Sequence, residues 1–435
     1  MIGTRILQAC MRKSLQKLRG SLKMLNSEKM IASLEQQDLE QAESYFQRAL
    51  QEDDAETLLA LAEYLESIGF LLHAKTIYLQ VCEAYPEVNI NLAQIAAEDN
   101  VIEEAFMYLD RIPEDSADYL SALLVMADLY DLEGLTDVAR EKLLQAAELS
   151  QEPIVIFGLA EIEMSLEHFS EAIEQYARLD NRHILELTGI STYQRIGRAY
   201  AYLGKFEAAV EFLEKALAIE YDDETVFELA TILYDQAAYQ KANLYFKQLE
   251  TMNADFLGYE YPYAMSLREE HRTEEALRLV QQGLRKNAFD PQLLLLASQL
   301  AFELHDPAGS ERYLLRAKEV AVDDEEVIMR LSSLYLDMER FEEVIALEHE
   351  EIDHVLTKWN LAKAYQALEQ QEKALTIYKD IEGDLKENPD FLQDYAYLLR
   401  EFGYTDQAVK QAKRYLQQVP DDIHMQGFLD DLRDD

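Results

Sequence analysis

Residues 196–217 read IGRAYAYLGKFEAAVEFLEKAL, and this stretch decides the fold class. Its small residues Gly197 and Ala209 lie twelve positions apart, where they let two antiparallel helices approach closely. Large residues such as Tyr200 are placed to fill the gaps between neighbouring helix pairs, and Gly204 suits a tight turn between the two helices. The stretch therefore predicts one helix–turn–helix unit.

The same pattern recurs along the chain. We call the small residue of each first helix its anchor, and a second small residue generally follows twelve positions later. The anchors are Met30 in a degenerate first copy, then Ala62, Ala93, Ala127, Ala160, Gly197, Ala230, Ala264, Ser298, Ser332, Ala362 and Ala396. From Ala62 onward the anchors follow one another at intervals of 30 to 37 residues, which is the signature of a repeat protein with about twelve units.

This register resembles the tetratricopeptide repeat, and the resemblance covers about residues 24–420. It implies an all-α, right-handed α-solenoid whose first helices line a concave groove. The tryptophan common in the first helix of that family is absent, apart from Trp359 one position away. As a whole the chain is similar to acidic multi-repeat tetratricopeptide proteins of low-GC Gram-positive bacteria.

The two ends differ from the repeats. Residues 421–435 are expected to form an acidic capping helix built on Met425, Phe428, Leu429 and Leu432. Residues 1–23 carry six basic and no acidic side chains. Two interpretations are open. The segment is either a basic amphipathic helix that docks on the acidic solenoid or a membrane, or an untranslated leader that is included because the start codon is placed too early.

Two intervals between anchors depart from the common length. We expect an extended connection at residues 181–188 and a shortened second helix near residues 348–355. Either place can hold a hinge or a binding loop, and either can be length variation that the surface tolerates.

The charge balance excludes several classes of ligand. The chain has 84 Asp and Glu against 40 Lys and Arg, a formal net charge of -44. Such a polyanion is not expected to bind nucleic acid, which needs cationic groups to replace counterions. No apolar stretch is long enough to span a membrane. The two cysteines, Cys10 and Cys82, form no CxxC pair and fit a reducing cytoplasm.

No residue pattern predicts catalysis, a cofactor or a metal site. Nucleotide-binding glycine motifs, the GxSxG nucleophile motif and paired CxxC motifs are all missing from the sequence. His349 and His354 lie five residues apart, which is not the spacing that puts two metal ligands on one helical face. We therefore predict a non-enzymatic protein.

Positions six and three residues before an anchor, and one and four after it, should face the groove. In the four copies anchored from Ala62 to Ala160, these positions hold acidic and no basic side chains. The acidic candidates are Glu56, Glu63, Glu66, Glu87, Asp128, Asp131 and Glu161. This pattern favours a basic segment of a partner, although general surface acidity would produce it too.

The same positions change character in the later copies. They hold the aromatic candidates Phe227, Tyr234, Tyr261, Phe302, Trp359 and Tyr397 and the basic candidates Arg198, Arg268, Lys363 and Arg400. Aromatic and arginine side chains are enriched in binding hot spots, and ordinary packing between repeats is the alternative for the aromatics.

We expect a cytoplasmic scaffold, monomeric or weakly self-associating, that holds an extended or helical segment of another protein in its groove. One alternative is a signalling receptor that senses a short peptide. Another, from a different class, is an enzyme with a hidden active site.

Overall fold

The structure is a computed structural model that describes residues 25–320, 325–348 and 352–434. It divides into two compact units, unit 1 up to Ile232 and unit 2 from Leu233. The predictions for residues 1–23 with Cys10, and for His349, lie outside the described residues.

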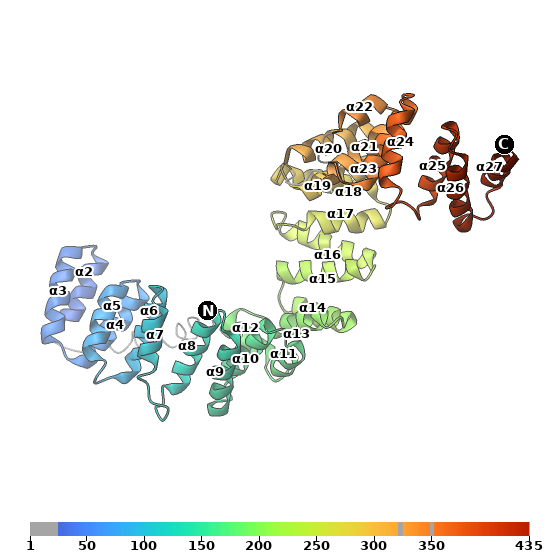
Figure 1. Ribbon diagram of the computed structural model, residues 1–435. Helices are drawn as coiled ribbons and strands as arrows, with labels where there is room; N and C mark the ends of the chain where they lie inside the picture. The colour runs from blue at the N-terminus through green and yellow to red at the C-terminus, as the bar shows by residue number, and fades with distance from the viewer. Residues whose placement is uncertain (1–24, 321–324, 349–351, 435) are drawn as a thin grey trace. The chain divides into compact units, whose positions relative to one another are not determined.

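Of the described residues 77% are helical, and none of them lies in a strand. Unit 1 contains the helix pairs α2 Asn26–Glu35 with α3 Leu39–Glu52, α4 Ala55–Ser67 with α5 Leu71–Val81, α6 Asn89–Glu98 with α7 Ile102–Leu109, α8 Tyr119–Leu132 with α9 Thr136–Leu149, α10 Pro153–Ser165 with α11 Phe169–Tyr176, and α13 Thr192–Tyr202 with α14 Phe206–Ile219 (Figure 1). The first helix of each pair is helix A, and the second is helix B.

Helix α15, Asp223–Asp235, contains the division between the units and is followed by α16, Tyr239–Met252. Unit 2 continues with α17 Glu260–Glu269 and α18 Thr273–Lys286, α19 Pro291–Glu303 and α20 Pro307–Val320, α21 Glu325–Asp337 and α22 Phe341–Ala346, α23 Val355–Ala367 and α24 Gln371–Ile381, α25 Pro389–Glu401 and α26 Thr405–Gln418, and the last helix α27 Ile423–Asp434. The all-α fold built from about twelve helix pairs is thus confirmed.

The anchors mark the places where helices A and B of a pair touch. Alanine anchors such as Ala62 and Ala160 are fully buried, and so is Ala209, twelve residues after its anchor. A methyl group added at Gly197 would lie 2.7 Å from Leu213 Cγ, too close for any real contact. The pattern of small residues therefore marks the points where the backbones of helices A and B lie too close together for larger side chains.

Each helix pair turns through one residue with a positive φ, seven positions after the anchor. Gly204 has φ 69° there, and the next amide donates back into helix A, from Lys205 N to Tyr200 O at 2.9 Å. Eight pairs place a residue other than glycine at this position: Gln37, Asn100, Glu167, Ala237, His271, His305, Glu339 and Glu369. The conformation is therefore imposed by the packing of the pair and does not require glycine.

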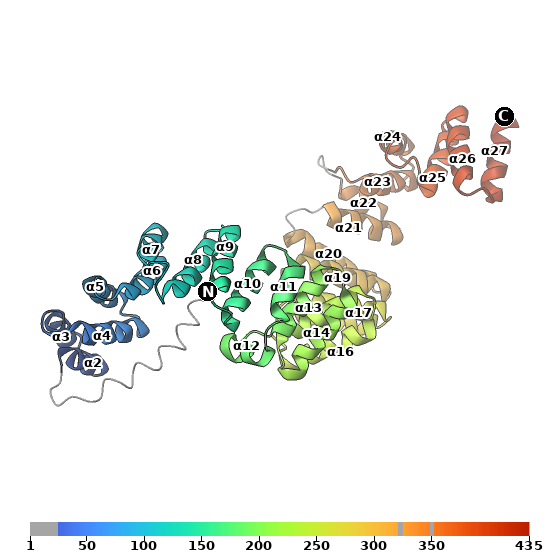
Figure 2. The same cartoon turned by 90° about the horizontal axis from the view of Figure 1, so that it is seen from below.

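The expectation of an extended connection at residues 181–188 was wrong, because these residues form the additional helix α12, Asn181–Thr188. Asp180 caps its first turn by accepting from His183 N at 2.8 Å, and Gly189 ends it with φ 73°. Ile184 buries its side chain in the core of unit 1. Both views show α12 beside α10 and α13 (Figures 1 and 2).

Two further features lie in unit 2. Helix α22 has only six residues, as expected from the short interval in that repeat. Helix α27 packs on α26 and buries four apolar side chains. These are Met425, Phe428, Leu429 and Leu432.

We predict that Gly197→Ala destabilises the protein, because the new methyl group overlaps Leu213. The matched control is Gly158→Ala in α10, where the methyl group would lie 3.4 Å from Leu143 and the helix gains up to about 1 kcal/mol of propensity. Urea denaturation should show a loss of about 1–3 kcal/mol for the first change and none for the second. Equal responses would contradict the close-contact argument.

Candidate partner-binding site on the first helices

The acidic candidates of unit 1 lie on helices A and on the short 3-10 helix η2, Pro86–Val88, before α6. Glu56, Glu63 and Glu66 belong to α4, Asp128 and Asp131 to α8, Glu161 to α10 and Glu87 to η2. Glu56 and Asp131 are exposed, and the others are half-buried. The residues therefore share one type of helix, but their surroundings differ.

Glu66 is a half-buried carboxylate with polar neighbours on both sides. Tyr78 Oη donates to Glu66 Oε2 at 2.6 Å, and Asn91 Nδ2 donates to the same oxygen at 3.0 Å. Burial raises the pKa of Glu66 above its ordinary value, Glu98 and Glu63 add to the rise, and the two hydrogen bonds oppose it. Burial and the neighbouring carboxylates therefore disfavour the charged form of Glu66, whereas the two hydrogen bonds favour it.

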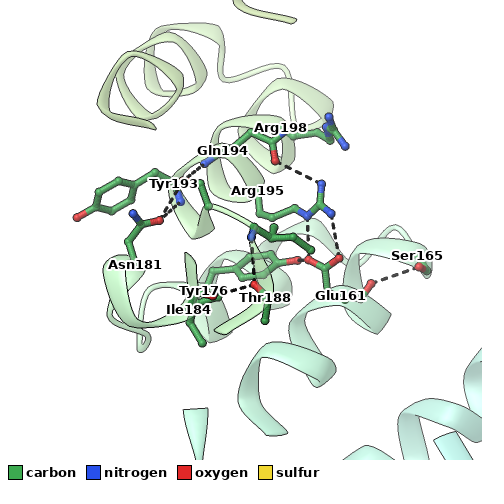
Figure 3. A network of polar contacts seen from close by, with 12 residues as sticks. Glu161, Ser165, Tyr176, Asn181, Ile184, Thr188, Tyr193, Gln194, Arg195 and Arg198 are labelled. Carbon is green, nitrogen blue, oxygen red and sulfur yellow. Dashed lines mark hydrogen bonds and ion pairs between the residues drawn. The ribbon is translucent and has the colours of Figure 1, made fainter. Parts of the chain in front are cut away.

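Glu161 already has a cationic partner within the chain. Arg195 of α13 donates two hydrogen bonds to its carboxylate, at 2.9 and 3.2 Å, and the buried Tyr176 hydroxyl donates to it from α11 (Figure 3). The sequence prediction treated Glu161 as part of an uncompensated acidic strip. In the structure its charge is paired, because Arg195 occupies a position that the predicted groove set did not include.

The additional helix α12 is joined to the same network by a capping interaction. Asn181 Oδ1 accepts from Ser191 Oγ, Thr192 Oγ1 and Tyr193 N at 2.9–3.2 Å, and so holds the first turn of α13 (Figure 3). Thr188 donates to Ile184 O at 2.8 Å at the other end of α12. These contacts fix α12 against the start of α13, and thereby position Arg195.

Three of the four basic candidates are also paired, each with a carboxylate of the next helix A. Arg198 donates to Glu228 at 3.1 Å, and Lys363 Nζ lies 3.2 Å from Asp394 Oδ2. Arg268 pairs with Glu303 at 2.7 Å. Arg400 is exposed, and its guanidinium carbon lies 5.3 Å from the Phe428 ring centre.

A simple rule connects these pairs. The residue one position after an anchor contacts the residue two positions before the next anchor. This holds for four contacts: Glu161 with Arg195, Arg198 with Glu228, Ser333 with Asn360, and Lys363 with Asp394. We call these four contacts the inter-repeat rungs. Residues of opposite charge at one position after an anchor and two positions before the next anchor are therefore a sequence signal for such contacts. This signal would have identified Arg195, Glu228 and Asp394.

The aromatic candidates divide by exposure. Tyr261, Phe302 and Tyr397 are 39%, 46% and 37% exposed. Phe227 and Tyr234 are half-buried. Trp359 is buried, edge-on to Phe391, with Lys363 Nζ 4.0 Å from its ring centre. Tyr397 packs edge-on against Phe428 of α27, and Trp359 is packed between repeats, so Tyr261 and Phe302 are the candidates with the most exposed rings.

The described residues contain neither a candidate membrane span nor a candidate metal cluster. Within residues 25–320, 325–348 and 352–434, no helix is long and apolar enough to cross a membrane. In the same ranges no group of three or more His, Cys, Asp or Glu residues could hold a metal ion.

The repeat register, the paired helices and the buried anchors are features of tetratricopeptide repeats. Family models match three segments: YpiA-like tetratricopeptide repeats at residues 132–184, a tetratricopeptide repeat at residues 190–223, and YpiA-like C-terminal tetratricopeptide repeats at residues 356–422. The chain is similar to the TPR repeat-containing protein YpiA of Bacillus subtilis (strain 168), with 28% identity over 320 residues, 72% of this chain and 75% of that protein.

Solved structures of other repeat proteins also align with the chain. The APC/C hetero-tetramer Cut9-Hcn1 has 15% identity and a TM-score of 0.36, over 96% of this chain and 98% of that chain. YrrB, described as a TPR protein with an unusual peptide-binding site, has 18% identity and a TM-score of 0.37, over 46% of this chain and 99% of that chain.

We predict that Arg195→Met lowers the free energy of unfolding by about 1–3 kcal/mol, because it leaves the Glu161 carboxylate without its charged partner. Combining it with Glu161→Gln in a double-mutant cycle should recover part of the loss. The control is Arg182→Met in α12, whose exposed pair with Glu186 should contribute less than about 1 kcal/mol. A similar loss in both variants would argue against the inter-repeat rung as a stabilising contact.

We predict that stability falls as the pH rises above about 10, the ordinary pKa of tyrosine. Burial and the neighbouring carboxylate raise the pKa of Tyr176, and burial raises that of Tyr108 to about 12. Because these hydroxyls stay protonated in the native state, the unfolded state alone releases their protons in this range, which favours unfolding. Urea denaturation from pH 8 to 11 measures the slope. Tyr176→Phe should make it shallower, and Tyr202→Phe, at an exposed site, should not.

Proposed function

We propose that this protein is a non-enzymatic scaffold that holds a segment of another protein against the helix A face of its repeats. Tetratricopeptide repeats generally act as protein-interaction modules, and an array of helix pairs offers one continuous type of surface to a long segment. We further propose that the segment is basic where it contacts unit 1. The alternatives named from the sequence, a peptide-sensing receptor and an enzyme, have no observation in their favour.

The observation that carries the proposal is the surroundings of Glu66. Its carboxylate is partly desolvated, and two further carboxylates, Glu63 and Glu98, raise its pKa. The ion pairs of the described residues give neither Glu63 nor Glu66 a cationic partner. A lysine or arginine of a partner would relieve this repulsion, and the gain on binding would be largest at low salt.

The basic segment proposed for unit 1 is compatible with apolar contacts in unit 2. Tyr261 and Phe302 expose their rings on helices α17 and α19. Exposed aromatic rings of this kind provide the contact area that dominates many interfaces. We propose that apolar side chains of the same partner bind there.

Charge reversal on the two kinds of helix tests the proposal. Glu63→Lys with Asp131→Lys changes helices A, and Glu103→Lys with Glu141→Lys makes the same change in net charge on exposed sites of helices B. Glu161 is left intact, because its reversal would break the contact with Arg195. Partners are captured with the wild-type chain, identified by mass spectrometry, and then measured against each variant.

We expect the helix A variant to bind its partner at least about tenfold more weakly and with a smaller dependence on salt, since it loses two close charge pairs. The helix B variant should bind nearly as well as the wild type. Equal weakening in both variants would mean that only net charge matters, and partners without a basic segment would contradict the acidic recognition surface.

A further inference from the structure

A second surface, on the opposite type of helix, has the opposite charge. In unit 2 a cavity of about 400 Å³ opens between the helices B α16 and α18, above helix α17. Its apolar floor consists of Tyr263, Leu267 and Leu279. Cavities of this size accept one or two side chains of a ligand.

The rim of the cavity is polar and predominantly cationic. It carries three basic and two acidic side chains, and two glutamines stand between the arginines. These rim residues are Lys247, Arg278 and Arg285, Glu250 and Glu275, and Gln281 and Gln282. In a chain with twice as many acidic as basic residues, a local excess of basic residues is unusual.

The two acidic side chains are already occupied. Glu250 accepts from Lys247 Nζ at 2.7 Å, and Glu275 accepts from Arg272 Nη2 at 2.8 Å. The pKa of Glu275 is lowered chiefly by its hydrogen bond to Arg272, with smaller contributions from Arg278 and Lys247.

Among the residues that the structure describes, by contrast, the two rim arginines have no carboxylate partner. Within those residues Arg278 donates only a long bond, 3.4 Å, to the carbonyl of Glu274, and the Arg285 side chain has no polar contact. Both are exposed on α18. They lie seven residues apart on one helix, which places them about 10 Å apart along its axis.

We infer that this cavity binds an acidic segment of a partner protein, with two carboxylates on Arg278 and Arg285 and an apolar side chain between them on the floor. Carboxylates three residues apart on a segment in the polyproline II conformation share one face and are separated by about 9 Å, which is close to the spacing of the arginines. Guanidinium groups bind carboxylates through two parallel hydrogen bonds, and the glutamines can bind the backbone of the segment. This site is separate from the helix A face and does not depend on the function proposed for it.

The test uses the full chain and a displayed library of random peptides. Peptides are selected on the wild type after depletion on Arg278→Gln with Arg285→Gln. We expect enrichment of sequences in which two acidic residues flank an apolar one. A synthetic peptide of the enriched sequence should bind the wild type at least about tenfold more tightly than the double variant.

Three controls make the outcome decisive. Lys241→Gln with Arg312→Gln removes two exposed positive charges outside the cavity and should leave the affinity unchanged. Leu267→Ala should weaken binding if the floor holds the apolar side chain. Enrichment of neutral or basic peptides, no enrichment, an equal loss in the charge control, or full competition by millimolar inorganic phosphate would each overturn the inference.

Discussion

The close contact between the two helices of each pair is the constraint on which the rest of the structure depends. At Gly197 there is no room for a methyl group, and at the pair Ser298 and Ser310 the two hydroxyls lie 2.8 Å apart across the same contact. Backbones this close require small residues twelve positions apart, and that spacing sets the length of the turn between them. The left-handed backbone conformation of the residue seven positions after the anchor then follows from geometry. Even Ala237 adopts this conformation, at a cost of about 1–2 kcal/mol.

The stacking of successive pairs produces the inter-repeat rungs. Once helices A lie side by side, the residue after one anchor and the residue two before the next come within hydrogen-bonding distance. Helix α13 uses this twice, because Arg195 pairs with Glu161 of α10 while Arg198 pairs with Glu228 of α15. Charges on helices A therefore stabilise the stack wherever their neighbours are complementary.

The fold was predictable from the sequence because its determinants are local and repeated. A small residue recurring at a fixed interval identifies helix A, and its companion twelve positions later identifies helix B. The inserted helix α12 escaped prediction, because Asp180 and Gly189, its capping residues, stand outside the repeat pattern and had been assigned to a connection. The site was predictable only as a list of positions. Whether Glu161 faces a partner or Arg195 depends on the neighbouring repeat, which the pattern of a single repeat does not contain.

The ion pairs between helices A show where part of the large negative charge of the chain is neutralised. Basic residues are scarce, and Arg195, Arg198 and Lys363 are all engaged between helices A, where they neutralise one carboxylate each. The half-buried Glu66 receives hydrogen bonds from Tyr78 and Asn91 in place of a cation. These neutral donors hold its carboxylate in a fixed position without cancelling its charge, so the field that it produces remains available at the surface. On α6 the neutral Asn91 occupies the repeat position that Arg195 fills three helices A later, so Glu66 receives a neutral donor where Glu161 receives a cation.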